Sequence, residues 1–228
     1  MERLIAIGDI HGNAAALETL LRQIEPRPTD TFVTLGDYID RGPDTRRVVE
    51  ILCNLGSHCR LIPIMGNHEE VLLSLIDRRP MRITFTDWLS LGGEETLRSY
   101  GVRSVAEIPP DHITFFRHTI SYRADAGFFF THALYDPSLP PSRHGKHLLR
   151  WARFEDRKTI PPPHMSGRRV IVGHTAQRDG RFIATPHFVC LDTCSYSPDG
   201  FLTAMELHTD RVWQATHDGH PYTQPEQK

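Results

Sequence analysis

The chain has 228 residues, of which 39% are hydrophobic, and its formal net charge is -2 at pH 7. This length predicts a single domain with one substantial core, and the nearly balanced charge gives no reason to expect a nucleic acid or an anionic membrane as partner. No run of 18 apolar residues is present, so a soluble, cytoplasmic protein is expected. Its four scattered cysteines are expected to be reduced thiols rather than a disulfide framework.

The first 75 residues or so repeat one unit three times: an apolar strand, a charged loop and a helix. Strands are expected at 4–8, 31–35 and 60–65, and helices at 13–24, at 44–55 with Gly56 closing the helix, and after residues 66–69. Successive right-handed crossovers of this kind build a parallel sheet. The loops are then expected to gather at one sheet edge, where open α/β sheets place their active sites.

The next segment, about 80–118, is expected to be a small helical insert beside that edge. Its role is left open between packing and substrate choice. Strand patterns then follow at 119–123, 127–131, 169–172, 187–191, 201–207 and 212–215. They predict a second sheet packed against the first, within one domain over 1–217, and the remaining 218–228 are expected to be a mobile tail.

Metal-binding residue types follow five of the predicted strands. The candidates are Asp9 and His11, then Asp37 and Asp40 with Arg41, then Asn67, His68 and Glu69, and finally His132 and His174. Carboxylates, imidazoles and an amide oxygen without any thiolate suit manganese, iron or zinc. Their number fits two metal ions that share one carboxylate.

Three motifs carry a specific resemblance: GDIHG at 8–12, GDYIDRG at 36–42 and GNHE at 66–69. The chain resembles the calcineurin-like metallophosphoesterases, and within them the phosphoprotein phosphatase branch, with its bacterial and phage lambda-type serine/threonine protein phosphatases. Many phosphodiesterase relatives have a second histidine two residues after the one that matches His174, whereas this chain has Ala176. The resemblance implies an α/β fold of two packed β-sheets flanked by helices.

The resemblance also implies the metal ligands. Asp9, His11 and Asp37 would hold one ion, and Asp37, Asn67, His132 and His174 the other. The ions are expected to be Mn²⁺, with Fe or Zn as alternatives. Two metals about 3.5–4 Å apart can clamp an in-line displacement, and a water bridging them becomes the nucleophile, so attack is direct and forms no phosphoenzyme.

The remaining site residues are expected to act on the substrate. The resemblance pairs His68 with Asp40 as a general acid that protonates the leaving group. Arg41, Arg153 and Asn67 would bind the phosphoryl oxygens, although Arg150 is a close rival of Arg153. Glu69 is interpreted as a charge in the first turn of a helix.

The substrate is the open question. The leading hypothesis is hydrolysis of phosphomonoesters, above all phosphoserine and phosphothreonine in proteins, by a monomer. The alternative is a symmetrical dinucleoside polyphosphate hydrolase, which the Asn-His-Glu motif and the lack of a long later insertion disfavour. A third hypothesis, an inactive metal-binding regulatory module, would be expected to lack His68, Asp40 or Arg41, and all three are present.

Overall fold

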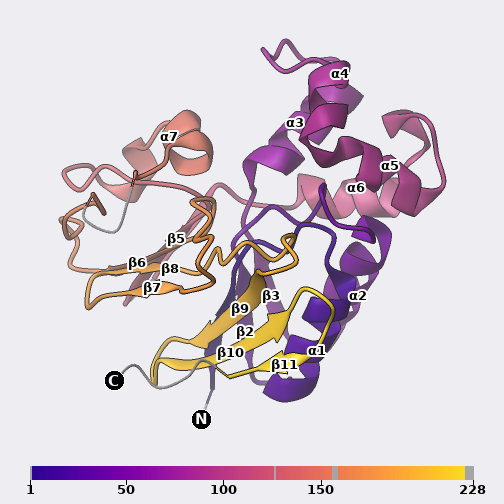
Figure 1. Ribbon diagram of the computed structural model, residues 1–228. Coiled ribbons are helices and arrows are strands. Elements are labelled where there is room, and N and C mark those ends of the chain that lie inside the picture. Colours follow the sequence, from indigo (N-terminus) through magenta and orange to yellow (C-terminus); the bar gives the residue numbers. More distant parts are fainter. Residues whose placement is uncertain (1, 126, 156–158, 224–228) are drawn as a thin grey trace.

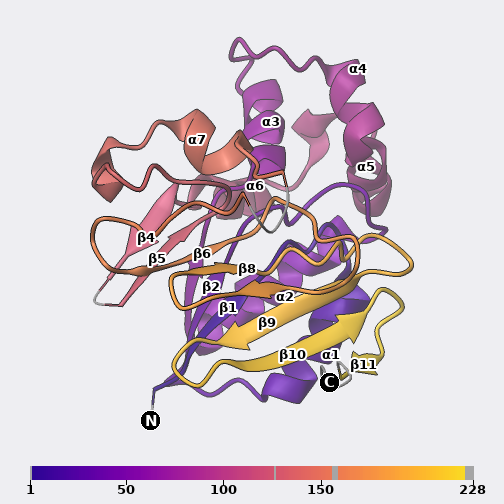
Figure 2. The same ribbon diagram turned by 60° about the vertical axis from the view of Figure 1, so that its left-hand side comes forward.

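Two β-sheets pack face to face, and helices cover the outer face of the larger one (Figures 1 and 2). The computed structural model describes residues 2–125, 127–155 and 159–223. This arrangement confirms the predicted α/β fold. The larger sheet has the order β11-β10-β9-β1-β2-β3, with β1 Leu4–Ile7, β2 Thr31–Thr34, β3 Arg60–Pro63, β9 Phe201–Glu206, β10 Arg211–Thr216 and β11 Pro221–Tyr222.

The parallel core of the larger sheet comes from the three predicted repeats. β1 pairs in parallel with β2, and β2 pairs in parallel with β3, so their carboxyl ends meet at one edge. The helices that connect them are α1 Ala14–Ile24, α2 Thr45–His58 and α3 Asn67–Ile76. Asn13 and Asp44 cap α1 and α2, because their side chains accept hydrogen bonds from backbone N–H groups in the first turn. The predicted end at Gly56 is wrong: α2 continues to His58, and the chain becomes extended only at Cys59.

The second sheet has the order β4-β5-β6-β8-β7, with β4 Tyr122–Ala124, β5 Phe128–Thr131, β6 Arg169–Val172, β7 Ile183–Ala184 and β8 Phe188–Cys190. Its short edge strand β7 and the helix α7 Lys146–Trp151 were not expected from the sequence. Not every strand of the second half joins this sheet. β9 pairs antiparallel with β1, so the C-terminal strands extend the larger sheet instead. Within the predicted mobile tail, Pro221–Tyr222 pair with β10, and residues 224–228 lie outside the described residues, so the mobility of the tail stays a prediction.

The predicted insert is helical. It contains α4 Phe85–Trp88, the π-helical turn Leu89–Gly93, α5 Glu94–Tyr100, the 3₁₀ turn Val105–Glu107 and α6 Pro110–Arg117. Figure 1 shows α4, α5 and α6 beside α3, above the carboxyl edge of the larger sheet. A further 3₁₀ turn, Pro141–Arg143, precedes α7. No helix of the described residues is both long and apolar enough to cross a membrane.

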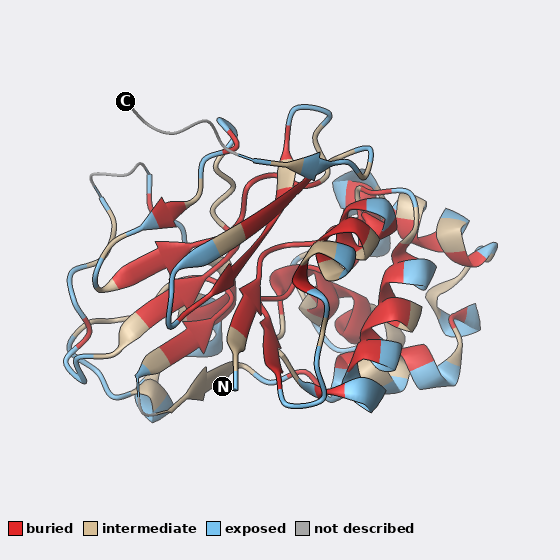
Figure 3. Ribbon diagram, turned by 90° about the horizontal axis from the view of Figure 1, so that it is seen from below, coloured by how far each residue is buried: buried red, intermediate tan, exposed pale blue. Residues whose placement is uncertain are grey.

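Strand side chains alternate between two layers of core. Ile5 and Ile7 of β1 face the helices, whereas Ala6 faces the second sheet and packs in one cluster with Phe130 and Ile171. The central strands of both sheets, such as β2 and β8, are therefore buried, whereas edge strands such as β3, β4 and β11 are partly exposed (Figure 3). This double-sided packing fixes the strands rigidly, so the loops at their ends are held in defined positions.

Candidate active site

The loops at the carboxyl ends of the strands bring the predicted site residues together. The β1–α1 loop carries Asp9 and His11, the β2–α2 loop carries Asp37, Asp40 and Arg41, and α3 begins with Asn67 and His68. His132 follows β5, and His174 follows β6 by two residues, so both sheets contribute. Every one of these side chains except Arg41 is buried.

Backbone strain concentrates in these loops. His11, Asp37, Asp40, Arg41 and His174 have φ between 46° and 70°, in the left-handed region that non-glycine residues rarely adopt. Each such residue costs on the order of 1–3 kcal/mol, and strain of this kind clusters at functional sites. The strained backbone directs these side chains toward a common centre.

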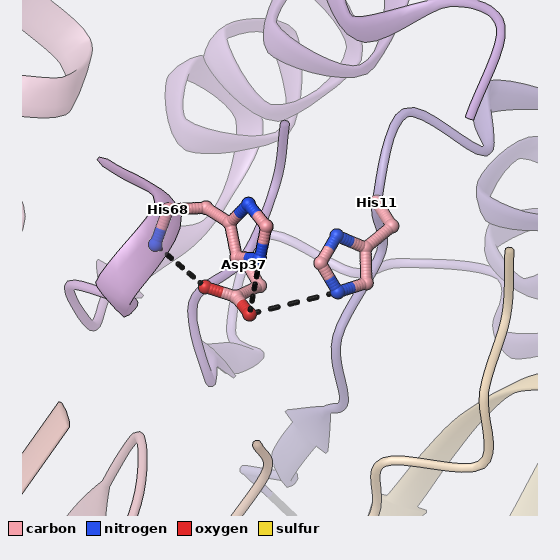
Figure 4. A group of neighbouring side chains, drawn as sticks. All are labelled: His11, Asp37 and His68. Atoms are coloured by element: carbon pink, nitrogen blue, oxygen red, sulfur yellow. Dashed lines mark hydrogen bonds and ion pairs between the residues drawn. The ribbon is translucent and has the colours of Figure 1, made fainter. Parts of the chain in front are cut away.

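The first donor group consists of His11, Asp37 and His68, which point toward one another (Figure 4). His11 Nε2 lies 3.5 Å from Asp37 Oδ2, and His68 Nε2 lies 3.9 Å from the same oxygen. His11 Nδ1 lies 2.9 Å from the carbonyl oxygen of Ile39, and the N–H it donates there leaves Nε2 as the nitrogen that faces the site.

The second donor group shares Asp37 and adds His132 and His174. His132 Nε2 lies 3.4 Å from Asp37 Oδ1, 3.1 Å from His174 Nδ1 and 3.1 Å from the amide oxygen of Asn67. The other ring nitrogen of His132 lies 2.7 Å from the carbonyl oxygen of Leu35 and donates to it. Lone pairs on oxygen and nitrogen therefore converge on one point, which suits a divalent cation.

The protonation states suit metal binding as well. Burial raises the pKa of Asp37, but His132, His68 and His11 outweigh this effect and hold its pKa well below the usual range. Burial and the neighbouring His132 lower the pKa of His174 to about 3, and burial also lowers the pKa of His132. Burial and the neighbouring Arg41 likewise lower the pKa of His11. A carboxylate with neutral imidazoles is the form that ligates metals, so Asp37, with His11 on one side and His132 and His174 on the other, fits two cations.

Asp9 lies at the same centre but outside both donor groups. Its two carboxylate oxygens accept hydrogen bonds from the backbone N–H of His174, at 3.2 Å and 3.0 Å. Burial, Asp192 and Asp37 raise its pKa, which shows that several acidic groups crowd this part of the site. The role of Asp9 as a metal ligand remains a prediction.

The predicted acid pair is formed in the structure. His68 Nδ1 lies 2.6 Å from Asp40 Oδ2, and both side chains are buried. Burial lowers the pKa of His68, but Asp37 and Asp40 outweigh it and the net pKa is raised. The imidazolium is therefore favoured, as a general acid requires.

The structure also places the arginines. Arg41 Nη1 lies 2.9 Å from His11 Nε2, and its guanidinium lies 4.6 Å from the centre of the Tyr196 ring. Arg153 Nε lies 3.2 Å from His174 Nε2. Arg150, in contrast, pairs with Glu70. Of the two candidates for the second phosphate-binding arginine, Arg153 is therefore the one that lies at the site.

Comparison with known proteins identifies the family. Residues 2–178 match the family model described as calcineurin-like phosphoesterase. The chain belongs to this family. It is therefore a metallophosphoesterase, and the metal dependence of the family agrees with the two donor groups around Asp37.

Two relatives that are similar in sequence share one name. The symmetrical bis(5'-nucleosyl)-tetraphosphatase of Pectobacterium atrosepticum is 39% identical over 70 residues, which are 30% of this chain and 24% of that protein. The one from Acidovorax sp. (strain JS42) is 40% identical over 82 residues, 35% of this chain and 28% of that protein. The matched segment thus spans about a quarter of each of these relatives.

Solved structures show the same fold at low identity. A putative diadenosine tetraphosphatase has a TM-score of 0.68 at 24% identity, and the superposition covers 94% of this chain and 93% of that chain. A protein serine/threonine phosphatase from Saccharomyces cerevisiae has a TM-score of 0.63 at 16% identity, with 98% and 81% covered. At these identities the likeness shows the shared fold alone.

Glu69 has a structural role in the site. Its carboxylate accepts hydrogen bonds from the backbone N–H groups of Asp37, Tyr38 and Gly66, at 2.8–3.0 Å. The interpretation as a first-turn helix charge is incomplete: Glu69 is a fully buried clamp between two loops of the metallophosphoesterase site. Its position three residues after Gly66, the spacing of a capping box, is a sequence signal for this role.

Proposed function

We propose that this metallophosphoesterase hydrolyses symmetrical dinucleoside polyphosphates such as diadenosine tetraphosphate. The proposal of hydrolysis rests on one observation: Asp37 is shared between two donor groups, one with His11 and one with His132 and His174. The substrate class is supported by the tetraphosphatases that are 39–41% identical over about a third of the chain. This replaces protein phosphoserine and phosphothreonine as the leading substrates, because the relatives that are similar in sequence carry the tetraphosphatase name.

The residues of the site divide the work between binding and proton transfer. Two divalent cations, when bound, supply an acidified water and neutralise phosphoryl charge. Arg41 and Arg153 lie on either side of the donor groups and bind phosphoryl oxygens through paired N–H donors. His68 donates its proton to the leaving oxygen as the phosphorus–oxygen bond breaks, so water and diadenosine tetraphosphate give two ADP.

Beside Arg41 there is room for more than a phosphate. A cavity of about 420 Å³ adjoins this residue and is lined by Leu89, Ser90, Leu91, Gly92, Glu94 and Glu95. Apolar side chains suit a nucleoside base, and carboxylates accept hydrogen bonds from sugar hydroxyls. The cavity therefore supports a substrate that extends beyond its reacting phosphate. Manganese as the metal, with iron and zinc as alternatives, and a monomeric state remain predictions.

The test is a comparison of three substrates after metal is stripped and Mn²⁺ is added back. We expect metal-dependent release of ADP from diadenosine tetraphosphate to exceed phosphate release from a phosphoserine peptide and from p-nitrophenyl phosphate. The Asp37→Asn variant, which removes the shared carboxylate, should be inactive on all three. A preference for the peptide would overturn the proposed substrate, and no turnover by the metal-loaded wild type on any substrate would overturn the hydrolase itself.

A further inference from the structure

The helical insert reaches into the buried acid pair. Asp40 Oδ2 accepts hydrogen bonds from His68 Nδ1 at 2.6 Å and from Trp88 Nε1 at 2.9 Å. Asp40 Oδ1 accepts a third from the hydroxyl of Thr96 at 2.7 Å. Trp88 and Thr96 are 48 and 56 residues from Asp40 along the chain, and all three side chains are fully buried.

The hydrogen-bond directions in this cluster are fully determined. Trp88 Nε1 can only donate, so Asp40 must accept there. The Thr96 hydroxyl donates to Asp40 Oδ1, and its oxygen accepts the backbone N–H of Asp40 at 2.9 Å. Thr45 supplies a further hydroxyl 3.1 Å from that of Thr96. Three donors thus hold one carboxylate in a single orientation.

The same insert also holds the backbone after Asp40. Arg41 N donates to the carbonyl oxygen of Gly92 at 3.1 Å. Gly92 has φ +111°, and a Cβ there would lie 2.3 Å from Arg41 N, so only glycine permits this approach. Asp40 and Arg41, both at φ 70°, are therefore held in their strained conformation by residues of the insert.

We propose that Trp88 and Thr96 are positioning residues for proton transfer by His68. They fix the Asp40 carboxylate, which fixes the His68 ring through Nδ1 and directs Nε2 toward Asp37 and the reacting phosphate. This inference rests on the proposed function, because it requires His68 to protonate the leaving group. It gives the insert a catalytic task that neither packing nor substrate choice describes.

The test is the dependence of kcat on the leaving group. Phenyl phosphate has a poor leaving group that needs a proton, whereas p-nitrophenolate leaves with little help. Trp88→Phe removes the donor and keeps an aromatic ring, and we expect kcat for phenyl phosphate to fall about tenfold. On p-nitrophenyl phosphate kcat should stay within about twofold, and the Mn²⁺ concentration for half-maximal activity should not change.

A second pair of variants guards against misfolding of the first. Thr96→Val removes the hydroxyl at nearly constant shape and should show the same selective loss, and Thr96→Ser should restore kcat for phenyl phosphate. Trp213→Phe is the matched control. Trp213 is also buried, at 6% exposure, and its Nε1 has no hydrogen-bond partner among the described residues. We expect Trp213→Phe to leave the ratio of kcat for phenyl phosphate to kcat for p-nitrophenyl phosphate unchanged.

The outcomes separate the two proposals. If the wild type with Mn²⁺ hydrolyses both esters and the Trp88 and Thr96 variants lose both rates equally, the positioning role is wrong and the proposed function stands. An unchanged kcat for phenyl phosphate in folded Trp88→Phe and Thr96→Val would refute it as well. If the wild type hydrolyses neither ester nor diadenosine tetraphosphate, the proposed function fails and this inference fails with it.

Discussion

Replacing Glu69 with alanine removes one side chain that supports two loops of the site. The backbone N–H groups of Asp37 and Gly66 both donate to Glu69 Oε2 at 3.0 Å, and that of Tyr38 donates to Oε1 at 2.8 Å. All of these residues are buried, so no bulk water replaces the lost acceptor directly. In Glu69→Ala, three backbone N–H groups lose their partner at once.

The expected loss of stability follows from the three backbone N–H groups that lose their acceptor. Each buried N–H left without a partner costs about 1–3 kcal/mol. Water can enter the space of the deleted carboxylate, so we take the lower end and expect a loss of about 3 kcal/mol in the free energy of unfolding. For a domain of this size 1 kcal/mol corresponds to about 2–4 °C in Tm, so the Tm should fall by roughly 6–12 °C. Thermal unfolding followed by circular dichroism, without metal, measures this change.

Glu94→Ala is the matched control, because Glu94 is an exposed glutamate of the insert whose ion pair with Arg98 is 2.9 Å long. Exposed pairs contribute about 0–1 kcal/mol, so its Tm should fall by no more than about 4 °C. Loosening of Asp37 should also weaken Mn²⁺ binding in Glu69→Ala alone. If Glu69→Ala unfolds at the same temperature as the control and binds Mn²⁺ like the wild type, Glu69 is not a clamp.

Two further predictions concern metal and pH. Mn²⁺ at 100 times its Kd should stabilise the wild type by about 2.7 kcal/mol, and Asp37→Asn should show no Mn²⁺-dependent rise in Tm because Asp37 belongs to both donor groups. A rise in the variant equal to that of the wild type would place the metals elsewhere. Burial raises the pKa of Asp30, but hydrogen bonds from Arg3 and from Arg27 N outweigh this effect, and its net pKa is lowered. Its contribution to stability is therefore present above its unfolded pKa of about 3.9 and lost as the pH falls through the folded value, so Asp30→Asn should be less stable than the wild type at pH 7 and converge with it in acid. A constant difference in the free energy of unfolding from pH 7 to the acid limit would contradict this.

The sequence alone determined the frame of the site. Apolar strands that each end in a ligand residue, with Asn13 and Asp44 at the helix starts, are local signals, and the local structure follows them. The carboxyl ends of parallel strands meet at one edge whatever the details of packing. That edge places Asp9, His11 and Asp37 together, whereas His132 and His174 follow strands of the other sheet and are grouped with Asp37 by the family resemblance.

Only the tertiary structure decided the parts that depend on contacts distant along the chain. Nothing local links Asp40 to Trp88 or Thr96, because those hydrogen bonds exist only once the insert has folded beside α3. The same holds for β9, which pairs on one side with β10, the next strand along the chain, but on the other side with β1, the first strand of the chain, rather than with β8.

Arg150 and Arg153 show why the sequence alone could not assign every site residue. The two residues are three apart, and both follow from the same short motif. α7 ends at Trp151 and the chain becomes extended at Ala152, so Arg150 stays on the helix and pairs with Glu70, while Arg153 reaches His174. Residue type decides which chemistry a side chain can perform, but the path of the folded backbone decides where it performs it.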